Sequence, residues 1–169
     1  FCVQETKAQD DQVAEALKEI TDYELFSNSA ERKGYSGTGI LSKQKPVAFK
    51  KNMGVEIHDL EGRITHSEFE HLHLVNVYIP NSGSGLKRLD YRAGWDRDFT
   101  NYLKELSKSK PLIVLSSKEN PPTTRQSSIA WYRKEHCFTM EANYCHYPFL
   151  LSGICTTVSF SLRRTRHLS

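Results

Sequence analysis

The sequence lacks a long hydrophobic run and a strong excess of either charge. No stretch of its 169 residues approaches the roughly 18 apolar residues that a membrane-spanning helix needs. Its 23 Lys and Arg residues against 20 Asp and Glu give a net charge of only +3, which tolerates a polyanionic partner without arguing for one. With 38% hydrophobic and 25% charged residues, the composition is typical of a single globular domain, and we expect no membrane partner.

Cysteine is sparse and follows no binding motif. The four cysteines Cys2, Cys137, Cys145 and Cys155 form no Cys-x-x-Cys pair. We interpret them as free thiols of an intracellular protein, with a disulfide-bonded chain as the alternative. The sequence opens at Phe1 without an initiator methionine, and its first residues predict a strand instead of a signal peptide. We therefore expect an internal fragment or a gene product that lacks its start.

Short apolar runs between turn residues predict a protein of mixed strands and helices. The expected strands cover residues 1–4, 23–26, 40–41, 47–49, 64–69, 72–79 and 111–115. Apolar residues at helical spacing predict a first helix that begins with Asp10 and Asp11 and runs to Ile20, and a longer helix that begins near Leu86. The apolar stripe of the longer helix comprises Trp95, Phe99, Leu103 and Leu106. Beyond residue 115 the periodicity fades, and Ser, Thr, Pro and Lys become frequent.

Several motifs follow one another in the part of the chain before residue 115. They are Gln-Glu-Thr-Lys at 4–7, Gly-Tyr-Ser-Gly-Thr-Gly at 34–39, Glu-Gly-Arg at 61–63, Asn-Val-Tyr-Ile-Pro-Asn-Ser-Gly at 76–83 and Leu-Lys-Arg-Leu-Asp-Tyr-Arg at 86–92. In this order and spacing, the chain resembles the exonuclease III family of apurinic/apyrimidinic (AP) endonucleases. The resemblance implies an α/β fold, a four-layer sandwich of two mixed β-sheets with flanking helices. It covers only part of that fold, so we expect a sandwich truncated at both ends.

The first motif contains a candidate metal ligand, Glu5. Mg²⁺ prefers oxygen ligands and is held by one or two carboxylates together with substrate phosphate and water. Taken alone, Glu5 has the ordinary interpretation of a surface residue. The resemblance implies that Glu5 binds Mg²⁺, with Mn²⁺ as an alternative metal, and that Lys7 lies beside the DNA backbone.

The glycine-rich segment is a candidate phosphate contact. Three glycines within residues 34–39 allow a backbone to approach a ligand closely and to present N–H groups to it. A tight strand connection is the structural alternative, and the absence of a Gly-Lys-Ser/Thr ending excludes a P-loop. The resemblance implies that Gly34 and Tyr35 contact DNA phosphates.

The strand at 72–79 ends beside a further set of polar residues. Tyr78 closes this strand, and on its own it has the common interpretation of a half-buried tyrosine at a strand end. The resemblance implies a catalytic role for Tyr78 and DNA contacts for Asn81 and Arg88. It assigns Glu61-Gly62-Arg63 only a structural role near the active face.

Several groups that the family uses for catalysis have no counterpart here. Where the family continues into Gly-Asp-Leu/Phe-Asn, this chain has Leu-Ser-Ser-Lys at 115–118, and it contains no Ser-Asp-His. Because catalytic groups act as a unit, the loss of one removes most of the rate. We therefore expect a partial AP-endonuclease-like domain over residues 1–114, a poorly ordered divergent tail over 115–169, and little or no activity of the chain alone.

The resemblance implies a Mg²⁺-dependent nuclease of base-excision repair that cleaves 5′ to abasic sites in double-stranded DNA. Its location would be nuclear, or cytoplasmic in the alternative. We expect a monomer that aggregates if strands of the sandwich are missing. The alternative function is a non-catalytic product that retains DNA or protein binding. A phosphoinositide phosphatase or sphingomyelinase on the same fold ranks lower, because the pattern over residues 81–92 is typical of the nuclease branch.

Overall fold

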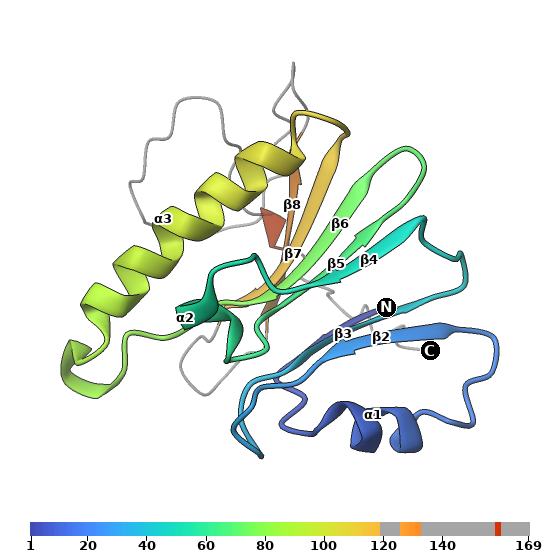
Figure 1. Ribbon diagram of the computed structural model, residues 1–169, viewed down its shortest axis with the longest axis horizontal. Helices are drawn as coiled ribbons and strands as arrows, with labels where there is room; N and C mark the ends of the chain where they lie inside the picture. Colours follow the sequence, from blue (N-terminus) through green and yellow to red (C-terminus); the bar gives the residue numbers. More distant parts are fainter. Residues whose placement is uncertain (119–125, 133–157, 160–169) are drawn as a thin grey trace, which may run out of the picture.

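The chain is described by a computed structural model that covers residues 1–118, 126–132 and 158–159 (Figure 1). Most of the divergent tail expected from residue 115 onward lies outside the described residues. The expected division into two domains and the expected disorder of the tail therefore stay predictions.

Up to residue 115 the predicted strands and both predicted helices form, with adjusted ends, whereas the strands at Gln126–Tyr132 and Val158–Ser159 are not predicted. The elements are β1 (Cys2–Gln4), α1 (Asp10–Ala16), β2 (Glu24–Asn28), β3 (Thr38–Ser42), β4 (Ala48–Lys51), α2 (Glu56–Asp59), β5 (Ile64–Glu68), β6 (His73–Tyr78), the 3-10 turn η1 (Ser84–Leu86), α3 (Leu89–Leu106), β7 (Leu112–Lys118), β8 (Gln126–Tyr132) and β9 (Val158–Ser159). Strands and helices alternate along the chain, which is typical of an α/β protein.

The strands form two sheets. One sheet has the order β1-β3-β2 and is antiparallel throughout, and the other has the order β4-β5-β6-β7-β8-β9. The pair β6–β7 is parallel, because α3 carries the chain back along the sheet between them. Strand β3 packs against β5 and β6, so the sheets lie face to face. Helix α1 covers the outer face of the smaller sheet and α3 that of the larger one (Figure 1), which confirms the four-layer α/β sandwich.

Both predicted helices differ from the structure at one end. Helix α1 ends at Ala16 instead of Ile20, because only Val13 of its apolar residues is buried and Ile20 is 42% exposed. Helix α3 begins at Leu89 instead of Leu86, because Leu86 adopts a φ of +58°, which an α-helix cannot contain. The short helix α2 gives no periodic signal in the sequence, so apolar spacing does not predict it.

The main hydrophobic core lies between α3 and the larger sheet. Its buried residues are Ile64, Val75, Val77, Trp95, Phe99, Leu112 and Val114. The predicted stripe of α3 is confirmed: Trp95 and Phe99 are buried and stack at 4.8 Å, and Leu103 and Leu106 pack against the same core. Strand alternation turns Asn76 to the opposite face of the sheet, toward the smaller sheet.

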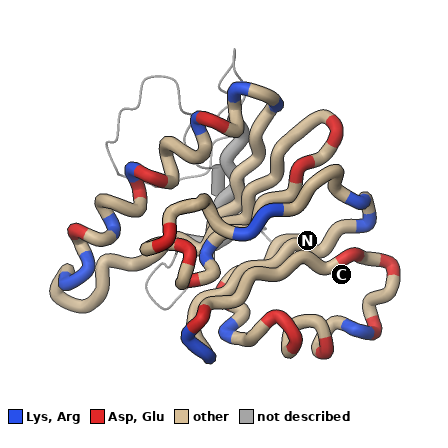
Figure 2. The backbone as a smooth tube through the Cα atoms, in the orientation of Figure 1, with Lys and Arg blue, Asp and Glu red and all other residues tan. Residues whose placement is uncertain are grey.

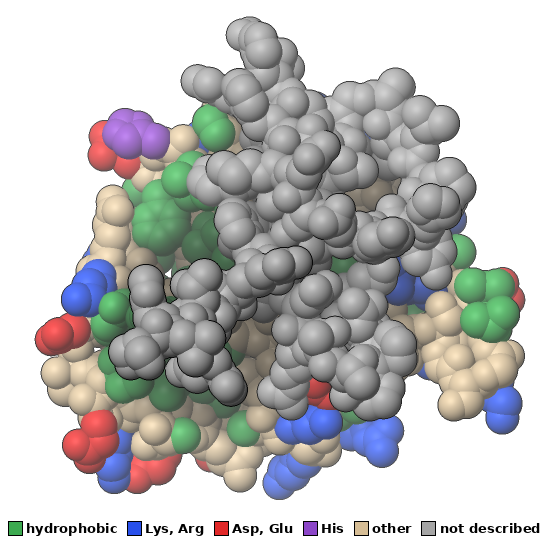
Figure 3. Space-filling model, turned by 180° about the vertical axis from the view of Figure 1, so that it is seen from behind, with side chains coloured by type: hydrophobic (Ala, Val, Ile, Leu, Met, Phe, Trp, Pro, Cys, Tyr) green, Lys and Arg blue, Asp and Glu red, His purple; other side chains and the backbone are tan. Residues whose placement is uncertain are grey.

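The charges of the described residues are distributed over the outer elements. Acidic and basic residues are mixed along α3, whereas the central strands β3 and β6 carry none (Figure 2). On the opposite side, acidic and basic side chains again lie next to one another on the visible surface (Figure 3). Among the described residues, no helix is long and apolar enough to cross a membrane.

Candidate functional site

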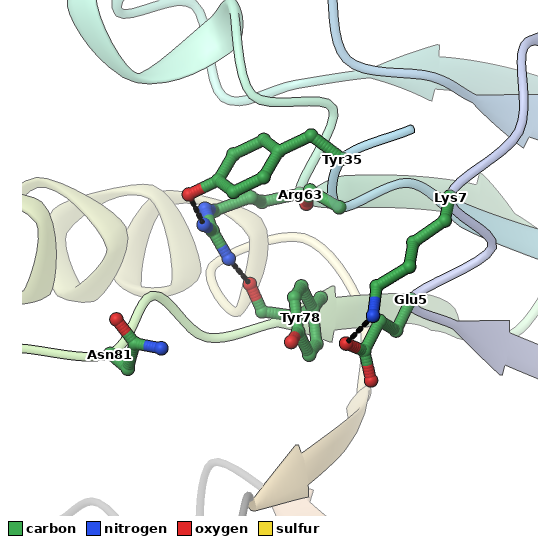
Figure 4. A pocket seen from close by; sticks show the side chains of 7 residues that line it. Glu5, Lys7, Tyr35, Arg63, Tyr78 and Asn81 are labelled. Carbon is green, nitrogen blue, oxygen red and sulfur yellow. Dashed lines mark hydrogen bonds and ion pairs between the residues drawn. The ribbon is translucent and has the colours of Figure 1, made fainter. Parts of the chain in front are cut away.

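Separate segments of the chain meet around one hollow of about 220 Å³ (Figure 4). Its lining residues are Glu5, Lys7, Tyr35, Ser36, Arg63, Tyr78 and Asn81. They come from the end of β1, the glycine-rich turn before β3, the residue before β5 and the end of β6. Both sheets therefore contribute to the hollow, which lies where their strands end at one side of the sandwich.

A strained backbone segment presents Glu5 and Lys7. Their φ angles are +58° and +50°, in the left-handed region that non-glycine residues seldom adopt. The backbone N–H of Lys7 donates to the carbonyl oxygen of Ser36 at 2.8 Å, which holds the segment in place. Gly37 is required opposite, because a Cβ there would overlap Oγ1 of Thr6. Backbone strain of this kind often marks a functional site.

The side chains of Glu5 and Lys7 form an ion pair at the rim of the hollow. Lys7 Nζ lies 2.8 Å from Glu5 Oε1, and the Glu5 side chain is 34% exposed. No group of three or more His, Cys, Asp or Glu side chains in the described part of the chain could hold a metal ion by itself. A single accessible carboxylate still fits Mg²⁺, because that ion takes most of its remaining ligands from water and substrate phosphate.

Arg63 is buried beneath the hollow and fixes both of its tyrosines. Its side chain is 4% exposed, and Nη1 donates to the carbonyl oxygen of Tyr78 at 3.0 Å. Nη2 donates to the hydroxyl oxygen of Tyr35 at 2.9 Å (Figure 4). The guanidinium also lies 5.1 Å from the centre of the Tyr78 ring. Because a guanidinium is planar and rigid, it holds the Tyr35 hydroxyl and the Tyr78 backbone at fixed positions around one group.

Glu61 neutralises Arg63 and connects it to Arg88. Its two carboxylate oxygens accept hydrogen bonds at 2.6 Å from Nε of Arg63 and at 2.6 Å from Nη2 of Arg88. Burial alone would raise the pKa of Glu61, but the hydrogen bonds and charges of the two arginines outweigh burial and hold this pKa below its usual value. Glu61 is therefore a carboxylate anion between two cations.

A second hollow adjoins the first and shares Tyr35 with it. Its lining residues are Glu31, Arg32, Tyr35, Leu60, Glu61 and Arg88. Nη1 of Arg88 donates to the Tyr35 hydroxyl oxygen at 3.1 Å. Two guanidinium groups thus converge on one phenol, which stands between the two hollows.

The structure brings most of the predicted site residues together. Glu5, Lys7, Tyr35, Tyr78 and Asn81 line the first hollow, and their predicted roles stay predictions.

The two remaining predicted residues lie close by. Arg88 lies in the adjoining hollow, and Gly34 stands next to Tyr35 in the turn with a φ of +71°. The resemblance assigns Glu61-Gly62-Arg63 only a structural role near the active face, so it predicts neither Arg63 as a lining residue nor Glu61 as its partner. The available signal was a pair of opposite charges around Gly62, directly before an apolar strand.

Sequence comparison identifies the family. Residues 1–115 match the endonuclease/exonuclease/phosphatase family, so the chain belongs to it. Together with the following nuclease relatives, this match confirms the resemblance to exonuclease III-type nucleases. An exodeoxyribonuclease of Bacillus subtilis (strain 168) is 46% identical over 114 residues, which are 68% of this chain and 44% of that protein. A DNA-(apurinic or apyrimidinic site) endonuclease of Dictyostelium discoideum is 43% identical over 139 residues, which are 76% of this chain and 38% of that protein.

Comparison with solved structures gives the same fold. An AP endonuclease from Archaeoglobus fulgidus superposes with a TM-score of 0.59 at 21% identity, over 68% of this chain and 44% of that one. The chain therefore spans less than half the length of the relatives that it matches.

Proposed function

We propose that this chain is the metal- and phosphate-binding part of a Mg²⁺-dependent DNA-(apurinic/apyrimidinic site) endonuclease of base-excision repair. Such an enzyme hydrolyses the phosphodiester 5′ to an abasic site and leaves a 3′-hydroxyl. The exodeoxyribonuclease and AP endonuclease relatives support a nuclease role in DNA repair. A repair role of this kind implies a nuclear location, or a cytoplasmic one if the chain has a bacterial source.

The observation that carries the proposal is the convergence of Glu5, Lys7, Tyr78 and Asn81 on one hollow. The carboxylate of Glu5 fits Mg²⁺, which would polarise a phosphoryl oxygen there. The Lys7 ammonium supplies positive charge to a phosphate, and the Tyr78 phenol can hydrogen-bond a phosphate oxygen.

For the chain by itself, we propose DNA binding without turnover. Hydrolysis also needs an aligned water and a stabilised leaving group. The segment at 115–118, where the family places its water-positioning Asp, reads Leu-Ser-Ser-Lys. The roles proposed for residues of the described hollow are metal and phosphate contacts, and none of these roles positions a water.

The test is duplex binding by the full 169-residue chain, measured by fluorescence anisotropy. The probe is a labelled duplex with one tetrahydrofuran abasic-site analogue, titrated in Mg²⁺ and in EDTA. We expect binding that weakens with salt and is at least about threefold tighter in Mg²⁺, because the metal screens phosphate from the carboxylate. A denaturing gel of the same samples should show no cleavage above background.

Glu5→Gln identifies the metal ligand. This change removes a carboxylate and releases Lys7 from its ion pair, so binding in EDTA should tighten while the response to Mg²⁺ disappears. Glu15→Gln is the matched control, because Glu15 is an exposed carboxylate on α1 paired with Lys18. Absence of duplex binding, or a Mg²⁺ response that survives in Glu5→Gln, would refute the proposal. Cleavage at a normal enzymatic rate would refute the binding-only role of the isolated chain.

A further inference from the structure

A tight backbone approach fixes the position of Glu61. Gly62 has a φ of +58°, and a Cβ on it would overlap the carbonyl carbon of Ser29 and lie 2.5 Å from the nitrogen of Ala30. Only glycine fits this close contact. Gly62 therefore holds the loop against the smaller sheet. This contact fixes the backbone position between Glu61 and Arg63.

The hydrogen bonds around Tyr35 determine where its hydroxyl hydrogen points. A phenol oxygen has two acceptor lone pairs and one O–H donor. N–H groups of Arg63 and Arg88 approach this oxygen at 2.9 Å and 3.1 Å, and guanidinium groups can only donate. Both lone pairs are thereby used, so the O–H group must point away from both arginines. Since Tyr35 lines both hollows, it is a donor available to a ligand there.

We propose that Glu61 is a positioning residue, which orients Arg63 and Arg88 so that the Tyr35 hydroxyl donates to a phosphodiester oxygen in the hollow. The inference rests on the proposed function of the hollow as a phosphate site. Glu61 holds each guanidinium through a separate carboxylate oxygen, and one of them also binds the Tyr78 carbonyl oxygen. A single side chain thus holds both guanidinium groups that contact the Tyr35 hydroxyl oxygen, one of which also binds the Tyr78 backbone.

The proposal is tested by whether removal of the Glu61 charge tightens or weakens duplex binding. If Glu61 were only a negative charge near bound DNA, its removal would tighten duplex binding by reducing repulsion. If Glu61 orients the arginines, Glu61→Gln places an amide N–H against a guanidinium and weakens binding at least about tenfold, the scale of one charged hydrogen bond.

Two further variants support this comparison. Glu31→Gln is the matched control, because Glu31 lines the same second hollow and its removal should tighten binding slightly. Glu61→Asp keeps the acceptor charge and should restore part of the affinity that Glu61→Gln loses.

A double-mutant cycle separates positioning from a general loss of structure. Tyr35→Phe should weaken duplex binding in the wild-type chain and have no further effect in Glu61→Gln, because the hydroxyl is already misdirected there. Additive effects of Tyr35→Phe and Glu61→Gln, or tighter binding by Glu61→Gln, would overturn the proposal. Circular dichroism of each variant establishes that it is folded.

An NMR measurement tests Glu61 independently of DNA. The Nε–H group of Arg63 donates to Glu61 at 2.6 Å from a buried position, so its exchange with solvent should be slow. Glu61→Gln should accelerate this exchange at least about tenfold, in line with a lost charged hydrogen bond, and Glu61→Asp should accelerate it less. Unchanged exchange would refute the positioning role. If the wild-type chain binds no duplex, the proposed function is refuted, but the exchange measurement still tests whether Glu61 positions Arg63.

Discussion

Asn76 of β6 donates a hydrogen bond from Nδ2 to the carbonyl oxygen of Val3 in β1, 2.9 Å away across the sandwich. The same amide nitrogen lies 2.9 Å from the carbonyl oxygen of Gly39 in β3, and Oδ1 of Asn76 accepts a hydrogen bond from the side chain of Gln4. Asn76 is fully buried. One polar side chain thus connects the central strand of each sheet and the strand that leads to Glu5.

Asn76→Ala should lower the free energy of unfolding by about 2 to 4 kcal/mol, because it leaves buried carbonyl oxygens without a donor and opens a cavity. Urea denaturation followed by circular dichroism measures the change. Asn101→Ala is the control, because Asn101 is exposed on α3 and its loss should change the free energy of unfolding by less than about 0.5 kcal/mol. Equal effects of the two substitutions would contradict the bridging role of Asn76.

Periodicity and motif order predict the scaffold but only part of the site. The stripe of Trp95 and Phe99 is visible in the sequence because helical spacing alone determines which face is buried. Family motifs bring Glu5 and Tyr78 together although 73 positions separate them in the chain, and periodicity cannot do this. A motif match transfers known contacts, and it says little of residues whose role depends on a particular partner.

The burial of Arg63 cannot be predicted from the sequence. A buried arginine is expected only where anionic and carbonyl partners surround it, and those partners come from Glu61, Tyr35 and Tyr78. The first residue of α3 cannot be predicted from the sequence for a different reason. Leu86 is a good helix former, but its positive φ is imposed by the turn that precedes the helix.

A buried pair of histidines predicts acid sensitivity. Nε2 of His66 lies 3.0 Å from Nδ1 of His73, Tyr102 approaches His66 at 3.0 Å, and Ser109 approaches His73 at 2.8 Å. Oγ of Ser109 donates to the carbonyl oxygen of Leu106, so it accepts from His73. Each ring then carries one N–H, and the chain of hydrogen bonds runs in one direction from Tyr102 with both rings neutral.

Protonation of either ring breaks this chain. Burial lowers the pKa of His66 to about 4, and the charges of His73 and Lys50 act in the same direction while Glu68 opposes them. Burial also lowers the pKa of His73, with Glu68 opposing and Lys110 and Lys50 assisting. Unfolded histidine titrates near pH 6.5, so below that pH the unfolded state takes up protons that the folded state excludes.

The free energy of unfolding should therefore be constant above about pH 6.5 and fall by about 1 to 2 kcal/mol between pH 6.5 and 5. Urea titrations across this range measure the slope. His66→Phe should flatten the slope, whereas His71→Gln should leave it unchanged, since the His71 side chain is 86% exposed. Stability that is flat or rises on acidification would refute the neutral pair.

The stability cost of the close contact at Gly62 can be measured by comparison with Gly54, which also has a positive φ. Gly62→Ala should cost about 3 kcal/mol or more, because the new Cβ meets the backbone of Ser29 and Ala30 in addition to the strained φ. Gly54 has a φ of +85° with nothing within 4 Å of the Cβ position, so Gly54→Ala should cost about 1 kcal/mol from backbone strain alone. Urea denaturation of both variants gives the difference, and equal costs would show that the contact at Gly62 relaxes freely.

Arg63→Lys tests whether the planar shape of the guanidinium matters beyond its charge. A lysine at this position keeps the positive charge but cannot reach Glu61, Tyr35 and the Tyr78 carbonyl oxygen at once. The free energy of unfolding should fall by about 2 to 3 kcal/mol, because buried partners of the guanidinium lose their donors.

Arg97→Lys provides the baseline for Arg63→Lys. The Arg97 side chain is 72% exposed and pairs with Asp98 at the surface, so the same replacement there should change stability by less than about 0.5 kcal/mol. Fluorescence of the buried Trp95, followed through urea titrations of both variants, measures the two values. A loss in Arg63→Lys no larger than in Arg97→Lys would mean that charge alone holds Tyr35 and Tyr78, and the rigid arrangement inferred for the hollow would then be wrong.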